Sequence, residues 1–178
     1  GLEGSAEVSL HIVDSVLNTE VSATVPAGES MEIRLGSGAI NAAGGTALAV
    51  GCNVLESESL EAAREKINAE LGSCDILING AGGNSPLGTT TKDTLELEDI
   101  AHKAEGVKTF FDLDPKGIEF VFNLNFLGTL LTTQCFAKDM VEKENATILN
   151  ISSMNAYRPL TRIPAYSAAK AAVSNFTQ

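Results

Sequence analysis

The amino-acid sequence predicts an α/β fold with a parallel sheet, preceded by a segment of a different character. From residue 41 onward, short apolar runs alternate with longer amphipathic patterns, as strands and helices do in such folds. Small and polar residues follow several of the apolar runs. In contrast, residues 1–38 alternate apolar and polar residues with a period of two, which indicates half-buried strands.

Residues 1–38 are expected to form an atypical β-rich segment. Period-two alternation occurs at 8–12, 21–25 and 31–35, and the Pro-Ala-Gly sequence at 26–28 is typical of a turn. These three strands would make a small antiparallel meander. The Gly-Ser-Gly sequence at 36–38 has the composition of a linker, so we place a domain boundary between 38 and 39.

Residues 39–178 are expected to hold the parallel sheet. Apolar runs at 46–50, 75–79 and 147–151 predict buried strands. One helix should begin at Ser57 as N-cap and end at Gly72, and a second should begin with Asp114 as N-cap and Pro115 and run towards residue 142. A short acidic helix is expected within 95–104, in the polar stretch 84–112, and an Ala-rich helix near Tyr166.

Composition excludes several classes of function. A formal net charge of −11 without a basic patch argues against nucleic-acid binding. We find no apolar run of the roughly 18–20 residues that a membrane span needs, and no secretion signal at the start. Three scattered cysteines indicate free thiols in a reducing cytoplasm, and two isolated histidines predict no metal site.

Tyr166 and Lys170 form the most informative pair. Residues four apart on a helix share one face, with Cβ atoms about 5–6 Å apart. A nearby ammonium favours the phenolate over the phenol, so this tyrosine could give or take a proton at an alcohol or carbonyl oxygen. A nicotinamide-dependent carbonyl reductase needs such a group, because its cofactor carries only the hydride.

Four motifs in order resemble the short-chain dehydrogenase/reductase family. They are Asn79-Gly80-Ala81-Gly82, Asn125, Asn150-Ile151-Ser152-Ser153, and Tyr166-x-x-x-Lys170 with Ser153 thirteen residues before the tyrosine. The resemblance covers about residues 39–178. It implies a doubly wound, Rossmann-like parallel sheet that binds NAD or NADP, and homodimers or homotetramers.

The resemblance also implies roles for individual residues. Tyr166 would be the general acid/base, Lys170 would assist it and hold the nicotinamide ribose, and Ser153 would hydrogen-bond the substrate oxygen. Asn125 would anchor a water in a proton relay. Asn53, Asn79, Ala81, Gly82 and Ile151 would lie against the cofactor. Each residue also has a purely structural interpretation, as a turn, a bent helix, a strand end or a solvated helix charge.

The stretch 84–112 is longer than the usual family layout allows. Together with residues 154–159 it resembles members that act on sugar acids and polyols, notably fructuronate reductase (mannonate oxidoreductase)-like enzymes. Asn155, Arg158 and Arg162 are then candidate substrate residues, because arginine forks suit carboxylates. The arginines could equally be surface residues, and the stretch itself is expected to be a lid or an interface element.

Two family features are missing from the sequence. A first strand with a Gly-rich TGxxxGxG turn does not occur. The chain stops at Gln178, in the helix expected at Tyr166 and before the family's last strands and substrate loop. Joined segments of a longer enzyme, a chimera or a damaged gene product would each explain this. Two other functions stay open: a non-catalytic fragment that serves assembly only, and a penicillin-binding acyl enzyme with the Ser167-x-x-Lys170 motif.

Overall fold

A computed structural model describes residues 6–10, 21–25, 42 and 44–178. The N-terminal strands belong to one compact unit, and the α/β part from Cys52 onward belongs, apart from the end of one helix, to another. The two units are treated separately below.

The N-terminal unit contains a two-stranded antiparallel pair. Strand β1 (Ala6–Leu10) pairs with β2 (Val21–Val25), with Ala6 opposite Val25 and Leu10 opposite Val21. This pairing confirms the antiparallel arrangement predicted for the first two strands. The third predicted strand, at 31–35, lies outside the described residues.

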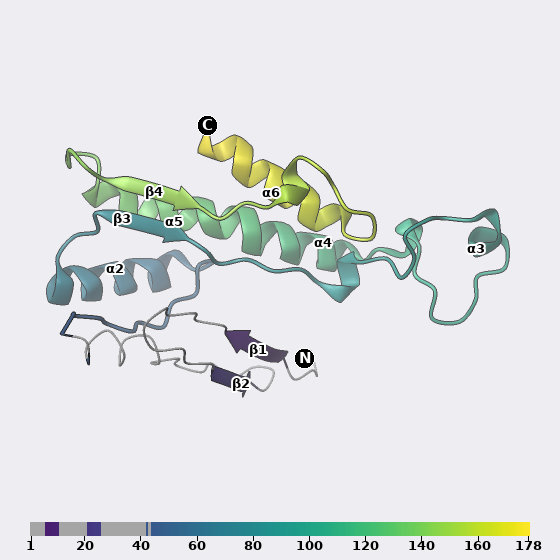
Figure 1. Ribbon diagram of the computed structural model, residues 1–178, viewed down its shortest axis with the longest axis horizontal. Coiled ribbons are helices and arrows are strands. Elements are labelled where there is room, and N and C mark those ends of the chain that lie inside the picture. Colours follow the sequence, from purple (N-terminus) through teal and green to yellow (C-terminus); the bar gives the residue numbers. More distant parts are fainter. Residues whose placement is uncertain (1–5, 11–20, 26–41, 43) are drawn as a thin grey trace. The chain divides into compact units, whose positions relative to one another are not determined.

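The α/β unit is built on a parallel pair of strands. Strand β3 (Ile76–Asn79) pairs with β4 (Thr147–Asn150) in a register that sets Asn79 beside Asn150, and the two arrows point the same way in Figure 1. The parallel pairing and the helices that separate the strands confirm the predicted α/β class. The run 46–50 is described without regular structure, so its prediction as a strand was wrong. A strand forms through hydrogen bonds to a neighbouring strand, which an apolar pattern of five residues does not by itself specify.

Helix α2 (Ser57–Leu71) packs on this pair through one apolar face. Leu60 meets Leu77 of β3 and Phe136 in a buried cluster. The helix ends at Gly72, which has a positive φ of 86° as expected of a C-terminal glycine. Its N-cap is Glu56 rather than the predicted Ser57, and the Glu56 amide donates to Asn53 O at 3.1 Å in the turn before the helix.

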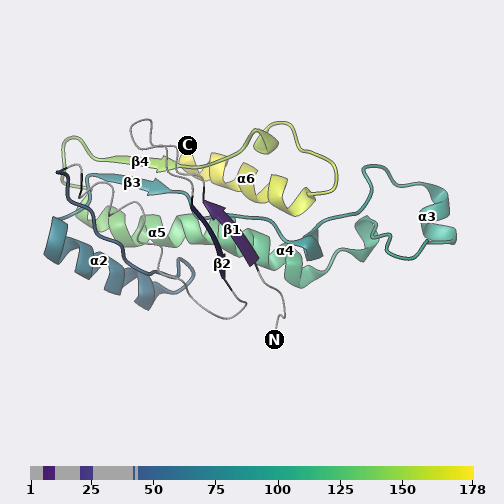
Figure 2. The ribbon, with the colours of Figure 1, turned by 60° about the horizontal axis from the view of Figure 1, so that its bottom comes forward.

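The predicted long helix begins as expected and then changes its winding. Asp114 caps α4 (Pro115–Phe122), with its side chain accepting from the Lys116 amide. A π-helical segment, η3 (Asn123–Leu127), follows and leads into α5 (Gly128–Phe136). Figure 2 shows α4 and α5 as one continuous rod. The extra residue in the π turn is a local distortion of the kind that often marks functional positions.

The rod is also long and apolar enough to span a membrane by length and composition alone, over residues 115–139. Core helices of soluble proteins pass the same test, and here Val121 and Cys135 are buried against other elements. The face carrying Phe120 and Leu127 is substantially exposed.

The remaining elements surround the end of this rod. Between Gly83 and Asp114 the chain makes an excursion with two short 3₁₀ turns (Pro86–Gly88 and Phe110–Asp112) and the helix α3 (Leu97–Ala101). Figure 1 shows α3 in a loop that extends past the start of α4. The last helix, α6 (Pro164–Thr177), begins with Pro164 at N1 and packs on α4 through Ala165 and Ala169. A 3₁₀ turn at Met154–Ala156 precedes it.

Candidate active site

The turn that follows β3 is anchored by a buried asparagine. The Asn79 amide donates to Thr133 Oγ1 at 2.9 Å and to Asn150 Oδ1 at 2.8 Å. It thereby ties the carboxyl ends of β3 and β4 to α5. After Asn79 the chain runs through Gly80 to Gly83, with Gly80, Ala81 and Gly82 exposed. These bonds fix the end of the strand from which the turn departs, and the role of Asn79 in stabilising the turn itself stays a prediction.

Asn125 clamps the same turn from the π-helical segment. Its side chain is fully buried (0% exposed), and its amide donates to Gly83 O at 2.6 Å and to Val121 O at 2.8 Å. In return Asn125 Oδ1 accepts from the Gly83 amide at 3.2 Å. These bonds use the whole amide group, so the distortion of the helix and the position of the turn depend on each other.

Gly82 passes very close to these groups. A Cβ added there would lie 2.7 Å from Asn125 Oδ1 and 3.2 Å from Lys170 Nζ. The first distance is shorter than a Cβ can tolerate. Asn125, Gly82 and Lys170, from three separate parts of the sequence, therefore converge at one place.

Lys170 reaches this place from α6. Its side chain is only 4% exposed, and its ammonium donates to Ile151 O at 2.8 Å. The same ammonium lies 5.8 Å from the centre of the Tyr166 ring, which confirms that the two residues share one helix face. Burial lowers the pKa of Lys170 below its usual value, because desolvation disfavours the charged form.

Tyr166 is partly buried at the start of α6. Within the described residues its hydroxyl has no hydrogen-bonding partner, whereas the Lys170 ammonium, with three donors, has a single protein acceptor. The site therefore keeps a phenolic hydroxyl and two ammonium donors available for another molecule.

The two serines after β4 have different roles. Ser153 caps the 3₁₀ turn by accepting from the Asn155 amide at 3.2 Å, and this turn packs against α6. Ser152 donates to Lys170 O at 3.1 Å and lies 2.6 Å from Ser174 Oγ. Ser152 thus holds α6 against the end of β4. Ser153 begins the 3₁₀ turn that precedes α6, the helix of Tyr166.

Three of the expected site residues lie outside this convergence. Asn53 begins the turn before α2, where its amide donates to Glu56 at 2.8 Å. Arg158 is exposed in the loop before α6. Arg162 is also exposed, and its Nε donates to Thr90 O at 3.0 Å. Asn155, by contrast, is buried in the turn that Ser153 caps.

Sequence reasoning missed two supporting residues, Thr133 and Ser174, and assigned no role to Asn150, although it lies in the Asn150–Ser153 motif. The signal for Asn150 was present, since each of two neighbouring strands ends in an asparagine. Thr133 and Ser174 are single polar residues on helices, and nothing in the sequence distinguishes them from solvent-facing ones.

The arrangement fits a bound nicotinamide nucleotide. The buried ammonium has donors to spare and would bind ribose hydroxyls. The exposed Gly80–Gly82 backbone would let the cofactor approach closely, with the exposed side chain of Ile151 beside it.

Comparison with known proteins agrees with this geometry. The family model for short-chain dehydrogenases matches residues 8–178. An uncharacterised oxidoreductase of Haemophilus influenzae is 59% identical over 139 residues, which are 78% of this chain and 47% of that protein. The uncharacterised oxidoreductase UxuB of Bacillus subtilis is 49% identical over 138 residues, again 78% of this chain and 48% of that protein.

A solved structure supports the same assignment. A Haemophilus protein provisionally named D-mannonate oxidoreductase, with bound NAD, superposes with a TM-score of 0.75 at 57% identity. The superposition covers 79% of this chain and 49% of that one. The chain thus spans about half the length of the curated relatives it matches. By its sequence match and by its fold, the chain belongs to the short-chain dehydrogenase family.

Proposed function

We propose that the protein is an NAD(P)-dependent oxidoreductase that interconverts an alcohol and a carbonyl, with Tyr166 as general acid/base. The single observation that carries the proposal is the Lys170 ammonium, buried with one protein acceptor beside a tyrosine whose hydroxyl is free. A buried cation with unused donors is costly, so a ligand that satisfies them would stabilise the site.

A bound nicotinamide supplies or accepts the hydride, and the protein handles the proton. In the reducing direction Tyr166 donates its hydroxyl proton to the carbonyl oxygen as negative charge develops there. Lys170 stabilises the resulting phenolate through its positive charge. Ser153 would donate a hydrogen bond to the same substrate oxygen, and Asn125 would hold the turn and the helix that frame the site.

We propose a sugar acid or a polyol as the substrate. Two observations support this class: the solved relative named as a D-mannonate oxidoreductase, and the long excursion between Gly83 and Asp114. Asn155, Arg158 and Arg162 remain candidate substrate residues. The exposed arginines would meet a carboxylate at the mouth of the site rather than at its base.

The test has two stages. The intact protein is first titrated with NADH and NADPH while nicotinamide fluorescence is followed, and the oxidation of D-mannonate with NAD or NADP is then measured. Tyr166→Phe should lower kcat by about 10²–10⁴-fold, the usual contribution of a general acid/base. Tyr157→Phe makes the same change at an exposed tyrosine and should leave kcat unchanged.

Failure to bind either nucleotide would refute the proposal, and a fully active Tyr166→Phe variant would refute the role of the tyrosine. Binding without turnover of D-mannonate would leave the reaction class and change the substrate.

One observation favours a second role in assembly. Phe120 and Leu127 are 49% and 36% exposed on the same helical rod, and an apolar face of this kind can pack on a second copy. We propose a homodimer or homotetramer. Sedimentation of Phe120→Ser should then show a smaller species than the parent. If nucleotide binding fails while the protein still assembles, the scaffold function is the better description.

A further inference from the structure

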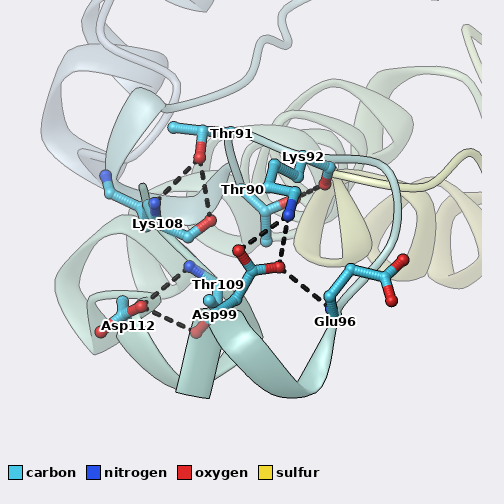
Figure 3. A network of polar contacts seen from close by, with 8 residues as sticks. All are labelled: Thr90, Thr91, Lys92, Glu96, Asp99, Lys108, Thr109 and Asp112. Atoms are coloured by element: carbon cyan, nitrogen blue, oxygen red, sulfur yellow. Dashed lines mark hydrogen bonds and ion pairs between the residues drawn. The ribbon is translucent and has the colours of Figure 1, made fainter. Parts of the chain in front are cut away.

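The excursion between Gly83 and Asp114 is an ordered element with its own polar framework. Lys92 makes an ion pair with Asp99, whose carboxylate also accepts from the Glu96 amide at 3.0 Å. Thr91 and Lys108 exchange hydrogen bonds, with the Lys108 amide donating to Thr91 Oγ1 at 2.9 Å. Figure 3 shows these contacts side by side, and they tie the two arms of the excursion to each other.

The framework continues at the base of the excursion. The carboxylate of Asp112 accepts from both the amide and the hydroxyl of Thr109, at 2.8 and 2.7 Å, and also pairs with Lys103. Asp114 N donates to Leu87 O at 3.1 Å, which joins the base to the start of α4.

A second attachment links the excursion to the loop before α6. The Thr90 amide donates to Arg162 O at 2.9 Å, and Arg162 Nε donates back to Thr90 O at 3.0 Å. Thr161 Oγ1 donates to Asp93 Oδ1 at 2.9 Å. Three hydrogen bonds thus connect two segments about seventy residues apart in sequence.

Arg162 has an unusual backbone conformation. Its φ is 68°, and it is the only residue other than glycine with a positive φ in the described part of the chain. Arginine, unlike glycine, has no intrinsic preference for a positive φ. Such a conformation persists only where the surrounding contacts enforce it. The reciprocal bonds with Thr90 are those contacts.

Arg162 lies two residues before the start of α6, the helix that carries Tyr166. Pro164 begins α6 two residues after Arg162, and Ser167 N already donates to Ile163 O at 3.1 Å in the first turn. Tyr166 is in this same turn. A cavity of about 210 Å³ lies between the excursion and the loop, lined among others by Thr90, Lys108, Leu160 and Arg162.

We propose that Arg162 is a positioning residue that couples the excursion to Tyr166. The excursion holds Arg162 in its left-handed conformation, and Arg162 in turn fixes the direction in which the chain enters α6. The position of the Tyr166 hydroxyl over the substrate therefore depends on contacts made by an element outside the convergence of Lys170, Asn125 and Gly82. This inference rests on the proposed function, because it assigns a source of precision to the same tyrosine.

The central variant is Arg162→Gly in the intact protein. Glycine accepts the positive φ without strain, so the backbone conformation remains possible while the bond to Thr90 O is lost. We expect kcat for the alcohol substrate to fall by about tenfold or more, since a misplacement of about 1 Å can cost about 10²-fold. The affinity for NADH, set by Lys170 and the Gly82 turn, should stay within about twofold of the parent.

Two further variants separate positioning from charge and from general damage. Arg162→Lys keeps the charge but lacks the Nε–H that donates to Thr90 O, and we expect it to behave like Arg162→Gly. Lys116→Ala removes an exposed cation from the first turn of α4 and should change neither kcat nor nucleotide affinity. Rescue of kcat by Arg162→Lys would show that charge alone is required and would overturn the proposal.

A measurement that does not need turnover completes the test. Hydrogen exchange by mass spectrometry in Arg162→Gly should accelerate both in residues 89–95 and in the first turn of α6. Faster exchange in 89–95 with an unchanged α6 would show that the two elements are uncoupled, which refutes the proposal whether or not the substrate is known. Absence of nucleotide binding in the parent would instead refute the proposed function.

Discussion

The convergence around Lys170 and the excursion 84–112 are both rich in polar contacts, yet different forces hold them together. Around Lys170 the contacts are buried amides and an ammonium bound to backbone carbonyls, with Asn125 fully enclosed. In the excursion they are ion pairs and capping boxes close to water, such as Lys103 with Asp112. Buried contacts between neutral groups, such as those of the Asn125 amide, resist salt and pH, whereas ion pairs near water respond to both.

The difference has a functional meaning. Under the proposed function, a hydride acceptor and a proton donor must be held to within a fraction of an ångström, which suits the buried contacts that the turn and α6 provide. The excursion, which in our inference acts on the tyrosine only through Arg162, can be looser elsewhere. Removal of a single group should therefore damage the convergence severely and the excursion mildly.

The largest effect is expected from Lys170→Met. Methionine keeps much of the side-chain length but removes the charge and all three donors, so both nucleotide binding and proton transfer should weaken. We expect kcat/KM to fall by about 10²–10⁴-fold, measured by steady-state kinetics with a parallel fluorescence titration of NADH. Lys138→Met, the same change at an exposed lysine that pairs with Glu61, is the control and should retain activity. If Lys170→Met kept its nucleotide affinity, the claim that the buried contacts around Lys170 matter more than those of the excursion would be wrong.

Gly82→Ala should follow in size. The new Cβ would meet Asn125 Oδ1 at 2.7 Å, and because Asn125 is clamped by three hydrogen bonds it has little freedom to yield. We expect a loss of about 1–3 kcal/mol in the free energy of unfolding, as for other overpacked sites, measured by urea titration.

Gly80→Ala provides the matched control two residues away. Its added Cβ would find its nearest neighbour at 4.0 Å, an ordinary contact with Ile151. Its free energy of unfolding should remain close to that of the parent. Equal losses at both glycines would mean that the turn as a whole, not the approach to Asn125, limits substitution.

Asn125→Ala tests the buried clamp directly. The substitution leaves the Gly83 N–H and C=O without their partner, and an unsatisfied buried backbone group costs about 1–3 kcal/mol. Thermal unfolding should show the loss, while Asn145→Ala, at an exposed asparagine, should show none. A stable Asn125→Ala variant with unchanged activity would remove the link between the π-helical segment and the site.

The smallest effect is expected from mild acid, and it should be confined to the excursion. Hydrogen bonds from Lys92 hold the pKa of Asp99 below its usual value, and those from Lys103 and Thr109 do the same for Asp112. Because each pKa is lower in the folded state than in the unfolded chain, the stabilisation is complete above about pH 4 and is lost as the pH falls further.

Hydrogen exchange, corrected for its intrinsic pH dependence, should therefore show opening of residues 89–112 below about pH 4 before α6 opens. Asp112→Asn should show a weaker dependence on pH than the parent. Simultaneous opening of both regions would contradict the distinction between them.

Much of the site could be predicted because its signals are local. The helix spacing of Tyr166 and Lys170, the strand end at Asn79 and the cap at Asp114 each depend on residues close in sequence, and the structure reproduces all three. The strand at 46–50 failed for the opposite reason. Its apolar pattern was right for a strand, but a strand also needs a neighbour, which no local pattern can supply.

The sequence by itself determined the class of fold, the family, and the helix face that carries Tyr166 and Lys170, because periodicity, caps and turn residues act over a few positions. Only the tertiary structure decided that Asn125, in a π-helical segment, would clamp Gly83, that Gly82 would pass against both Asn125 and Lys170, and that Arg162, with a positive φ, would bond Thr90. Those contacts join residues about forty to ninety positions apart, and they exist because buried polar groups must find partners wherever packing brings them.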